Sequence, residues 1–179
     1  MEDSEILRKI RQPDTKEYGF NLLVRKYQEK IYWHIRRMVA DHEDADDLVQ
    51  ESFIKIYRNI HAFREDSQLY TWIYRISTNV CLSFLKKKKR KFFLPLTEIT
   101  DDLVAKLNNT ELVTGDLIQK KLHEAILRLP NKQRVVFNLK YFDNLKYEDM
   151  QEITGTSIGA LKASYHHAIK KIEEFLKEN

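Results

Sequence analysis

The chain has 179 residues, of which 42% are hydrophobic and 32% are charged, a composition typical of a globular protein that can bury a core. Four glycines and three prolines leave few tight turns, which disfavours an all-β fold and favours long helices. The N-terminal MEDSEILRKIRQ lacks a secretory pattern, no apolar run reaches the roughly 20 residues of a membrane helix, and Cys81 is the single cysteine. We therefore expect a cytoplasmic protein without membrane insertion or disulfides.

The net charge of +4 is unevenly distributed along the chain. Residues 92–115 are acidic, whereas 1–91 and 116–179 each carry a basic excess. Two basic blocks joined by an acidic connector predict two modules that each face a polyanion.

In the first module, apolar residues at spacings of three and four over 20–39 predict an amphipathic helix. Asp41 is the expected N-cap of a second helix, whose first turn is rich in acids that suit the helix dipole. Its inward face is expected to hold Leu48, Val49, Phe53, Ile56, Tyr57 and Ile60.

The segment FREDS at 63–67 interrupts the periodicity and predicts a loop. A third helix follows, with Leu69, Trp72, Ile73, Ile76 and Val80 inward, and continues into KKKKRK at 86–91. Three such helices predict a compact bundle. Phe63, Tyr70 and Tyr74 are either packing residues or aromatic surfaces for unpaired bases.

Residues 92–115 lose clear periodicity and are expected to form a flexible linker, with a short helical piece at 103–107. In the second module, Pro130 marks the start of a helix. A short helix in KYEDMQEI, a turn containing Gly155, Ser157 as N-cap and a long final helix predict a helix-turn-helix. An ordinary helical hairpin is the alternative.

The final helix is predicted to bury Ile158, Leu161, Tyr165 and Ile169. Its opposite face offers small and polar groups that suit the major groove of duplex DNA, namely Lys162, Ala163, Ser164, His166 and His167. The lysine run at 86–91 exceeds what a helix C-terminus needs and favours contact with phosphates, for which Lys86 and Lys87 are candidates.

Six acidic residues between Asp41 and Glu51 form the most concentrated acidic segment of this basic chain. Asp47, Gln50 and Glu51 fall on one outward stripe with Ile54, separate from the inward face. A solvated acidic face is the alternative, but an apolar residue continuing a polar stripe favours a basic protein partner. An acidic stripe cannot serve DNA.

The six histidines are scattered, and no carboxylate or cysteine stands at helical ligand spacing to both His166 and His167, which point to different sides of a helix. Neither a nucleophile arrangement nor a glycine-rich phosphate loop is present. We therefore expect neither a metal site, nor a cofactor, nor an enzyme.

Two long segments together resemble the extracytoplasmic-function (ECF) group of bacterial sigma factors. DADDLVQESFIKIYRNIHAF, followed by FREDSQLYTWIYRISTNVCLSFLKKKKR, resembles sigma region 2, and LPNKQRVVFNLKYFDNLKYEDMQEITGTSIGALKASYHHAIKKI resembles region 4. The resemblance implies an all-α fold of two small helical domains: region 2 at 1–91, a linker at 92–115 and region 4 at 116–179. It implies a transcription initiation subunit that is not an enzyme.

The resemblance also assigns residues to partners. The β′ clamp helices of core RNA polymerase would bind Asp47, Gln50, Glu51 and Phe53, and the β subunit is a further expected contact. The melted −10 promoter element would contact Phe63, Arg64, Glu65, Asp66, Ser67 and Asn79, with Lys86 and Lys87 on phosphates. The −35 element would contact Lys162, Ala163, Ser164, His166 and His167. An anti-sigma factor is an expected partner that nothing in the chain identifies.

Four positions depart from the family pattern. Glu65 stands where many relatives have glycine, and Gln151 replaces a usual small residue in the helix-turn-helix. Ala160 and Ser164 replace a threonine and an arginine of the recognition helix, so we expect an unusual −35 sequence or weaker reliance on it.

Two rival functions remain open from the residues. An autonomous helix-turn-helix transcriptional regulator would bind duplex DNA without polymerase, but it needs neither the acidic stripe nor the aromatic loop. A helical scaffold whose basic run contacts membrane or RNA is the second rival, but such a scaffold does not need the turn in KYEDMQEITGTS.

Overall fold

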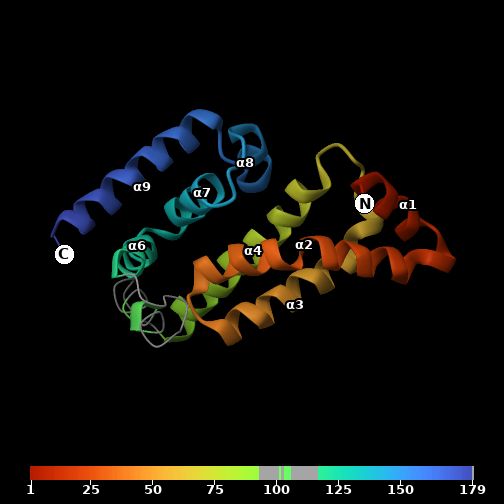
Figure 1. The fold of residues 1–179 in the computed structure, drawn as a ribbon, viewed down its shortest axis with the longest axis horizontal. Helices are drawn as coiled ribbons and strands as arrows, with labels where there is room; N and C mark the ends of the chain where they lie inside the picture. Colours follow the sequence, from red (N-terminus) through yellow and green to blue (C-terminus); the bar gives the residue numbers. More distant parts are fainter. Residues whose placement is uncertain (93–100, 102, 106–116, 179) are drawn as a thin grey trace.

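The computed structural model describes residues 1–92, 101, 103–105 and 117–178, and every regular element in them is helical (Figure 1). This confirms the predicted all-α fold with two groups of helices. No helix among these residues is long and apolar enough to cross a membrane. Most of the predicted linker at 92–115, including 106 and 107 of its short helical piece, lies outside the described residues.

The first module begins with a helix that the sequence reading did not predict. Helix α1 (Asp3–Arg11) leads through a 3₁₀ turn, η1 (Pro13–Thr15), into α2 (Lys16–Val39). It buries Ile6, Leu7 and Ile10 against α2, and the Thr15 hydroxyl donates to the Lys9 carbonyl at 2.8 Å. The apolar side of α1 and this turn fix the N-terminus on the bundle.

Helix α3 (His42–Asn59) and helix α4 (Leu69–Phe92) complete the first module, with η2 (Ile60–Ala62) after α3. The Asp41 carboxylate accepts from the Asp44 N–H at 2.9 Å, which confirms the predicted N-cap. FREDS has no regular structure, and α4 extends through the lysine run, both as predicted. Of the six expected inward residues of the second helix, Tyr57 is instead 37% exposed.

The second module contains α6 (Leu117–Leu127), α7 (Asn131–Tyr141), α8 (Tyr147–Thr154) and α9 (Ile158–Glu178). Pro130 is the N-cap of α7, as its fixed φ suits a helix start. Gly155 ends α8 with φ +69°, a left-handed conformation that favours glycine. The Ser157 hydroxyl accepts from the Ala160 N–H at 3.4 Å, so the predicted short helix, turn and long helix are present.

The two modules pack against each other and share one buried cluster. That cluster joins residues of α1–α4, together with Leu103 and Val104, to residues of the second module: Leu127, Val135, Val136, Leu139, Met150, Ile153 and Leu161. Figure 1 shows α8 against α4 and α7 near α2, and these pairs are in contact. Helix α3 lies on the far side of α2 and α4 from the second module (Figure 1).

The close approach of α1 to α2 gives a stability prediction. A Cβ on Gly19 would lie 2.8 Å from the Ile10 backbone nitrogen and 2.9 Å from Lys9 Cβ. We expect Gly19→Ala to lower the free energy of unfolding by about 1 to 2 kcal/mol, because the clash exceeds the gain in helix propensity. Urea denaturation followed by circular dichroism measures the change.

Gly159 is the matched control, because it is also helical and a Cβ there would have no neighbour within 4 Å. Gly159→Ala should leave stability unchanged or raise it by up to about 1 kcal/mol. Equal effects at the two glycines would contradict the packing described for α1.

Candidate protein and nucleic-acid interfaces

The acidic stripe, defined as Asp47, Gln50 and Glu51, is exposed on α3. Ile54 continues it and is 50% exposed, and Glu51 pairs with Lys55 at 2.8 Å one turn away. Phe53 does not lie on this surface, because it is 8% exposed and belongs to the core cluster. The stripe therefore offers carboxylates beside an apolar side chain, with Phe53 supporting it from beneath.

The acids before the stripe have a local role. Asp41 caps the helix, and Asp46 lies 3.4 Å from His42, one turn earlier. These contacts stabilise the start of α3.

A second surface is the pocket beside the FREDS loop, which we call the loop pocket. It has a volume of about 360 Å³, and it is lined by Ala62, Phe63, Arg64, Asp66, Ser67, Thr71, Trp72, Arg75 and Glu152. Phe63 is buried and lies against Trp72, with ring centroids 5.3 Å apart, so these two aromatic rings form a rigid wall. Arg64 and Asp66 are exposed at the rim.

The loop itself holds an unusual backbone conformation at Glu65. Its φ is +61°, in the left-handed region where a side chain costs about 1 kcal/mol or more and glycine does not. The Glu65 carboxylate forms an ion pair with Arg11 of α1. Glu65, which stands where many relatives have glycine, thus keeps a glycine-like backbone conformation. Its ion pair links the loop to α1.

The outer face of α4 extends the loop pocket along the helix. Arg75 and Asn79 follow Trp72 at spacings of three and seven residues and are both exposed. Lys86, seven residues beyond Asn79, is exposed as well, and so is Lys87. The predicted DNA contacts on α4 therefore lie on its exposed surface, between the loop pocket and the lysine run.

The third surface is the start of α9. Lys162, Ala163, His166 and His167 are exposed and Ser164 is half-buried, while Leu161, Ala168 and Ile172 anchor the helix. The Lys162 ammonium lies 5.6 Å from the centroid of the Tyr147 ring of α8. This face presents small and polar groups around cationic or titratable ones, a pattern suited to duplex DNA.

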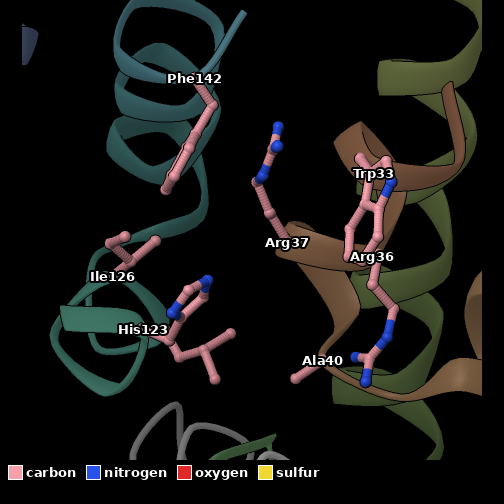
Figure 2. Close-up of a pocket in the computed structure, with 8 residues that line it drawn as sticks. Trp33, Arg36, Arg37, Ala40, His123, Ile126 and Phe142 are labelled. Carbon is pink, nitrogen blue, oxygen red and sulfur yellow. The ribbon is translucent and has the colours of Figure 1, made fainter. Parts of the chain in front are cut away.

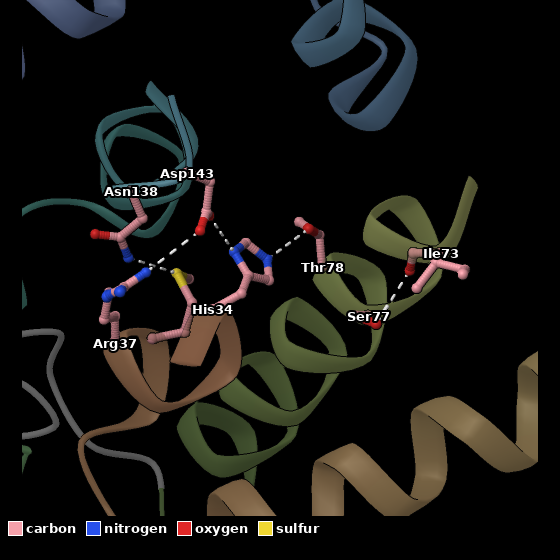
Figure 3. A network of polar contacts seen from close by, with 8 residues as sticks. His34, Arg37, Ile73, Ser77, Thr78, Asn138 and Asp143 are labelled. Atoms are coloured by element: carbon pink, nitrogen blue, oxygen red, sulfur yellow. Dashed lines mark hydrogen bonds and ion pairs between the residues drawn. The ribbon is translucent and has the colours of Figure 1, made fainter. Parts of the chain in front are cut away.

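A polar network joins the modules around one carboxylate, as Figure 3 shows. Asp143, after α7, lies 3.4 Å from both His34 Nδ1 and Arg37 Nη1 of α2. The other ring nitrogen of His34 lies 2.9 Å from the Thr78 hydroxyl of α4. Burial first, and Asp143 second, raise the pKa of the Tyr74 phenol, so Asp143 also faces α4.

A further buried contact between the modules is made by Arg134 of α7, which is 2% exposed. Its Nη1 donates to the Met38 carbonyl at 2.8 Å, and its Nη2 donates to the carbonyls of Leu127 and, at 3.2 Å, Leu129. Burial lowers the Arg134 pKa to about 10, which still leaves the side chain charged at neutral pH.

A cavity of about 320 Å³ remains beside this contact, between α2 and the α6–α7 corner (Figure 2). Arg37 extends into the space between Phe142 and Trp33, with its guanidinium carbon 4.2 Å from the Phe142 ring centroid. Arg36 Nε and Nη1 are buried without a hydrogen-bond partner. The interface is therefore incompletely packed at this end.

Metal and thiol chemistry find no support in the part of the chain that the structure describes. No group of three or more His, Cys, Asp or Glu side chains there could hold a metal ion. Cys81 is fully buried, and burial raises the pKa of its thiol, which lowers the thiolate fraction that would react.

Comparison with known proteins assigns both modules. Residues 23–91 match the profile of Sigma-70 region 2, and residues 119–172 match that of Sigma-70 region 4. The chain belongs to the sigma-70 family. Below, region 2 and region 4 denote the first and second modules.

Curated relatives place the chain in the ECF group of RNA polymerase sigma factors. The sigma-H factor of Pseudomonas aeruginosa is 31% identical, with 98% of this chain and 94% of the relative covered. The ECF sigma factor SigW of Bacillus subtilis is 30% identical, with 89% and 90% covered. Sigma factors are transcription initiation factors rather than enzymes, so the predictions of family and of a non-enzymatic role are confirmed.

Solved structures show the same fold. The sigma factor RpoE, in complex with the anti-sigma factor NepR from Bartonella quintana, is similar at a TM-score of 0.69 and 22% identity, with 88% of this chain and 96% of that chain covered. CnrH, in complex with the cytosolic domain of CnrY, is similar at 0.69 and 17% identity, with 99% of both chains covered.

The residues that join region 2 to region 4 were missed by the sequence reading. His34 and Arg134 sit within helices that each read as local amphipathic patterns, and Asp143 read as part of a turn. The signal that could have identified one of them is a polar residue inside an apolar run, as His34 is between Trp33 and Ile35. Arg134 follows the polar residues Asn131, Lys132 and Gln133 and gives no such signal.

The backbone at Glu65 gives a second prediction. Glu65→Gly and Glu65→Ala both remove the ion pair with Arg11, but only glycine relieves the left-handed φ. We expect Glu65→Gly to be more stable than Glu65→Ala by about 1 kcal/mol. Paired urea denaturation curves measure the difference, and equal stability of the two variants would show that the loop does not hold this conformation.

Proposed function

We propose that this sigma factor binds core RNA polymerase through the acidic stripe, traps a base of the melted −10 element in the loop pocket and places α9 on the −35 element. The observation that carries the proposal is the arrangement of region 2. It presents an exposed acidic stripe on α3 and an aromatic pocket with a basic helix edge on α4. A protein that binds duplex DNA alone needs neither.

The acidic stripe suits a basic protein surface. Asp47 and Glu51 are exposed carboxylates on one side of α3, and Ile54 adds apolar area beside them. Charge complementarity of this kind orients two proteins and speeds their association. The clamp helices of the β′ subunit, which the family resemblance implies, are the proposed partner, with the β subunit as a further contact.

The loop pocket suits an unstacked base. Phe63 and Trp72 supply an aromatic wall, while Arg64, Asp66 and Ser67 supply hydrogen-bonding groups at the rim. Asn79, Lys86 and Lys87 are the proposed contacts of the flanking strand along α4. Stacking contributes about 1 to 3 kcal/mol per base, comparable to the few kcal/mol needed to unstack one.

Region 4 is proposed to bind duplex DNA through Lys162, Ala163, Ser164, His166 and His167. The side chains at positions 160 and 163 are small and project little from α9, and Lys162 can reach phosphates. Because arginine is absent from position 164, we expect little discrimination for guanine there.

An anti-sigma factor is a further proposed partner. It is supported by the two similar structures, one of which is a sigma factor bound to an anti-sigma factor. Binding to core polymerase, as proposed, would place the protein in the cytoplasm.

Promoter-dependent transcription tests the proposal as a whole. Purified chain is mixed with bacterial core polymerase and genomic DNA fragments, and transcripts are mapped by sequencing. We expect discrete start sites that need both components. Tight, sequence-specific duplex binding by the chain alone, with no gain from core enzyme, would instead favour an autonomous helix-turn-helix regulator.

Charge reversal of the acidic stripe gives a third prediction. Asp47→Lys with Glu51→Lys should weaken binding to core polymerase by at least about tenfold, because two attractive pairs become repulsive. The fold should survive, since both side chains are exposed and the lost Glu51–Lys55 pair contributes about 0.5 kcal/mol or less. Fluorescence anisotropy of labelled chain measures the affinity, and circular dichroism checks the fold.

Glu173→Lys with Glu174→Lys on α9 is the matched control, because it makes the same charge change at exposed positions of region 4. It should leave core affinity near the wild-type value. Equal losses in both double variants would mean that net charge, and not the stripe, governs binding.

A further inference from the structure

The cavity of about 320 Å³ between α2 and the α6–α7 corner has a cationic part and an apolar part (Figure 2). Arg36 and Arg37 of α2 supply the cationic groups, and Trp33, Ile126 and Phe142 supply apolar surface. No acidic residue in the described part of the chain lines it. Ligand pockets in proteins are mostly apolar, carry a few polar groups that orient the ligand, and begin at about 300 Å³. The cavity therefore suits a small molecule.

Arg36 is the buried cation of this cavity, and part of its hydrogen-bonding capacity is unused. The residue is 2% exposed, and its Nε and Nη1 have no hydrogen-bond partner in the described chain. Burial lowers the pKa of Arg36, and Tyr32, Asp41 and Asp46 offset only part of that effect. A buried donor without an acceptor costs free energy, and an anion that supplies the acceptor reduces the cost. Arg36 therefore favours an anion in the cavity.

Arg37 is a second cation, and its charge is only weakly neutralised. Its Nη1 lies 3.4 Å from the Asp143 carboxylate, which is longer than the roughly 2.7–2.9 Å of a strong charge-assisted hydrogen bond. The side chain extends into the space between Trp33 and Phe142 (Figure 2), with its guanidinium carbon 4.2 Å from the Phe142 ring centroid. A carboxylate in the cavity would gain charge-assisted hydrogen bonds from this group.

The other walls of the cavity are mostly apolar and come from both regions. Ile126 and Leu127 belong to α6, and Ala40 follows α2. Figure 2 shows His123 and Ile126 on one side of the space and Trp33 on the other. A ring or short hydrocarbon placed between them would leave water and fill an unpacked volume, and both changes are favourable.

We propose that this cavity is a binding site for a small organic acid, a molecule with one carboxylate on an apolar body such as an aromatic ring. The carboxylate pairs with Arg36 and Arg37, and the apolar body lies against Trp33, Ile126 and Phe142. A neutral ring would leave the arginines without an acceptor, and a bare anion would leave the apolar wall unfilled. The site shares no residue with the acidic stripe, the loop pocket or the proposed DNA contacts of α9, so it can be tested apart from the proposed function.

Fluorine NMR of para-fluorobenzoate, titrated with the full chain, tests binding. We expect saturable binding with a dissociation constant of about 0.1 to 1 mM, a range suited to a ligand of this size. The comparison ligands are para-fluorobenzamide, which has the ring without the charge, and trifluoroacetate, which has the charge without the ring. Each should bind at least about tenfold more weakly. Equal affinity for either one, or no saturable binding of para-fluorobenzoate, would overturn the proposal.

Arg36→Met and Arg37→Met test the two cations, because methionine keeps a long apolar side chain and removes the charge. Each should weaken para-fluorobenzoate binding by about fivefold or more. Arg36→Met should also leave stability unchanged or raised, since its unpaired N–H groups disappear. If Arg36→Met does not fold, Arg37→Met carries the test, because its side chain is 20% exposed. Unchanged affinity in the folded variants would show that the ligand does not pair with these arginines.

Arg58→Met on α3 is the matched control, because Arg58 is exposed, does not line the cavity and loses the same charge. It should bind para-fluorobenzoate as wild type does. His123→Trp keeps both arginines but fills the cavity from a half-buried position, and it should weaken binding by about tenfold or more. Wild-type affinity in His123→Trp would place the ligand elsewhere and overturn the site.

Thermal unfolding gives a second readout on the same chains. At ten times its dissociation constant, para-fluorobenzoate should raise the unfolding midpoint of wild type by about 3 to 5 °C, because it binds the folded chain. The midpoint of His123→Trp should not change at that concentration. An equal rise in both chains would mean that the ligand stabilises the protein without occupying the cavity, which contradicts the proposal.

Discussion

The guanidinium of Arg134 is the point at which region 2 and region 4 share one set of hydrogen bonds. It donates to the carbonyl of Met38 near the end of α2 and to those of Leu127 and Leu129 at the end of α6. Carbonyls at helix C-termini lack partners within their own helices and carry partial negative charge, so they can hold a buried cation without a carboxylate. Desolvation lowers the pKa of Arg134 to about 10, and the three acceptors offset that cost while the group stays charged. Loss of this side chain would leave carbonyl groups at helix ends of both regions without a hydrogen-bond donor. The position of region 4 on region 2 and the structure at the end of α6 therefore depend on the same side chain.

Because region 4 packs on region 2, one side of region 2 is free and the other is covered. Helix α3 presents its acidic stripe away from region 4, whereas α4 turns its aromatic and basic side toward α8 (Figure 1). Polymerase contact and DNA contact therefore place different demands on the interface between the regions. The stripe needs nothing from region 4, but the loop pocket is complete only with Glu152 at its edge. A basic protein thus keeps a carboxylate beside its own proposed DNA site.

The local structure was largely predictable from the sequence, and the contacts between modules were not. Helical periodicity, the cap at Asp41 and the turn at Gly155 act over a few residues, so α2, α3, α4 and the helix-turn-helix followed from the pattern. Helix α1 was not predicted, although Ile6 and Ile10 have helical spacing. The outward place of the stripe and the inward place of Phe53 both followed from the helical pattern, but the burial of Phe53 disagrees with the polymerase contact that the family resemblance assigned to it. The pairing of His34 with Asp143 joins residues more than a hundred positions apart, which no local pattern encodes.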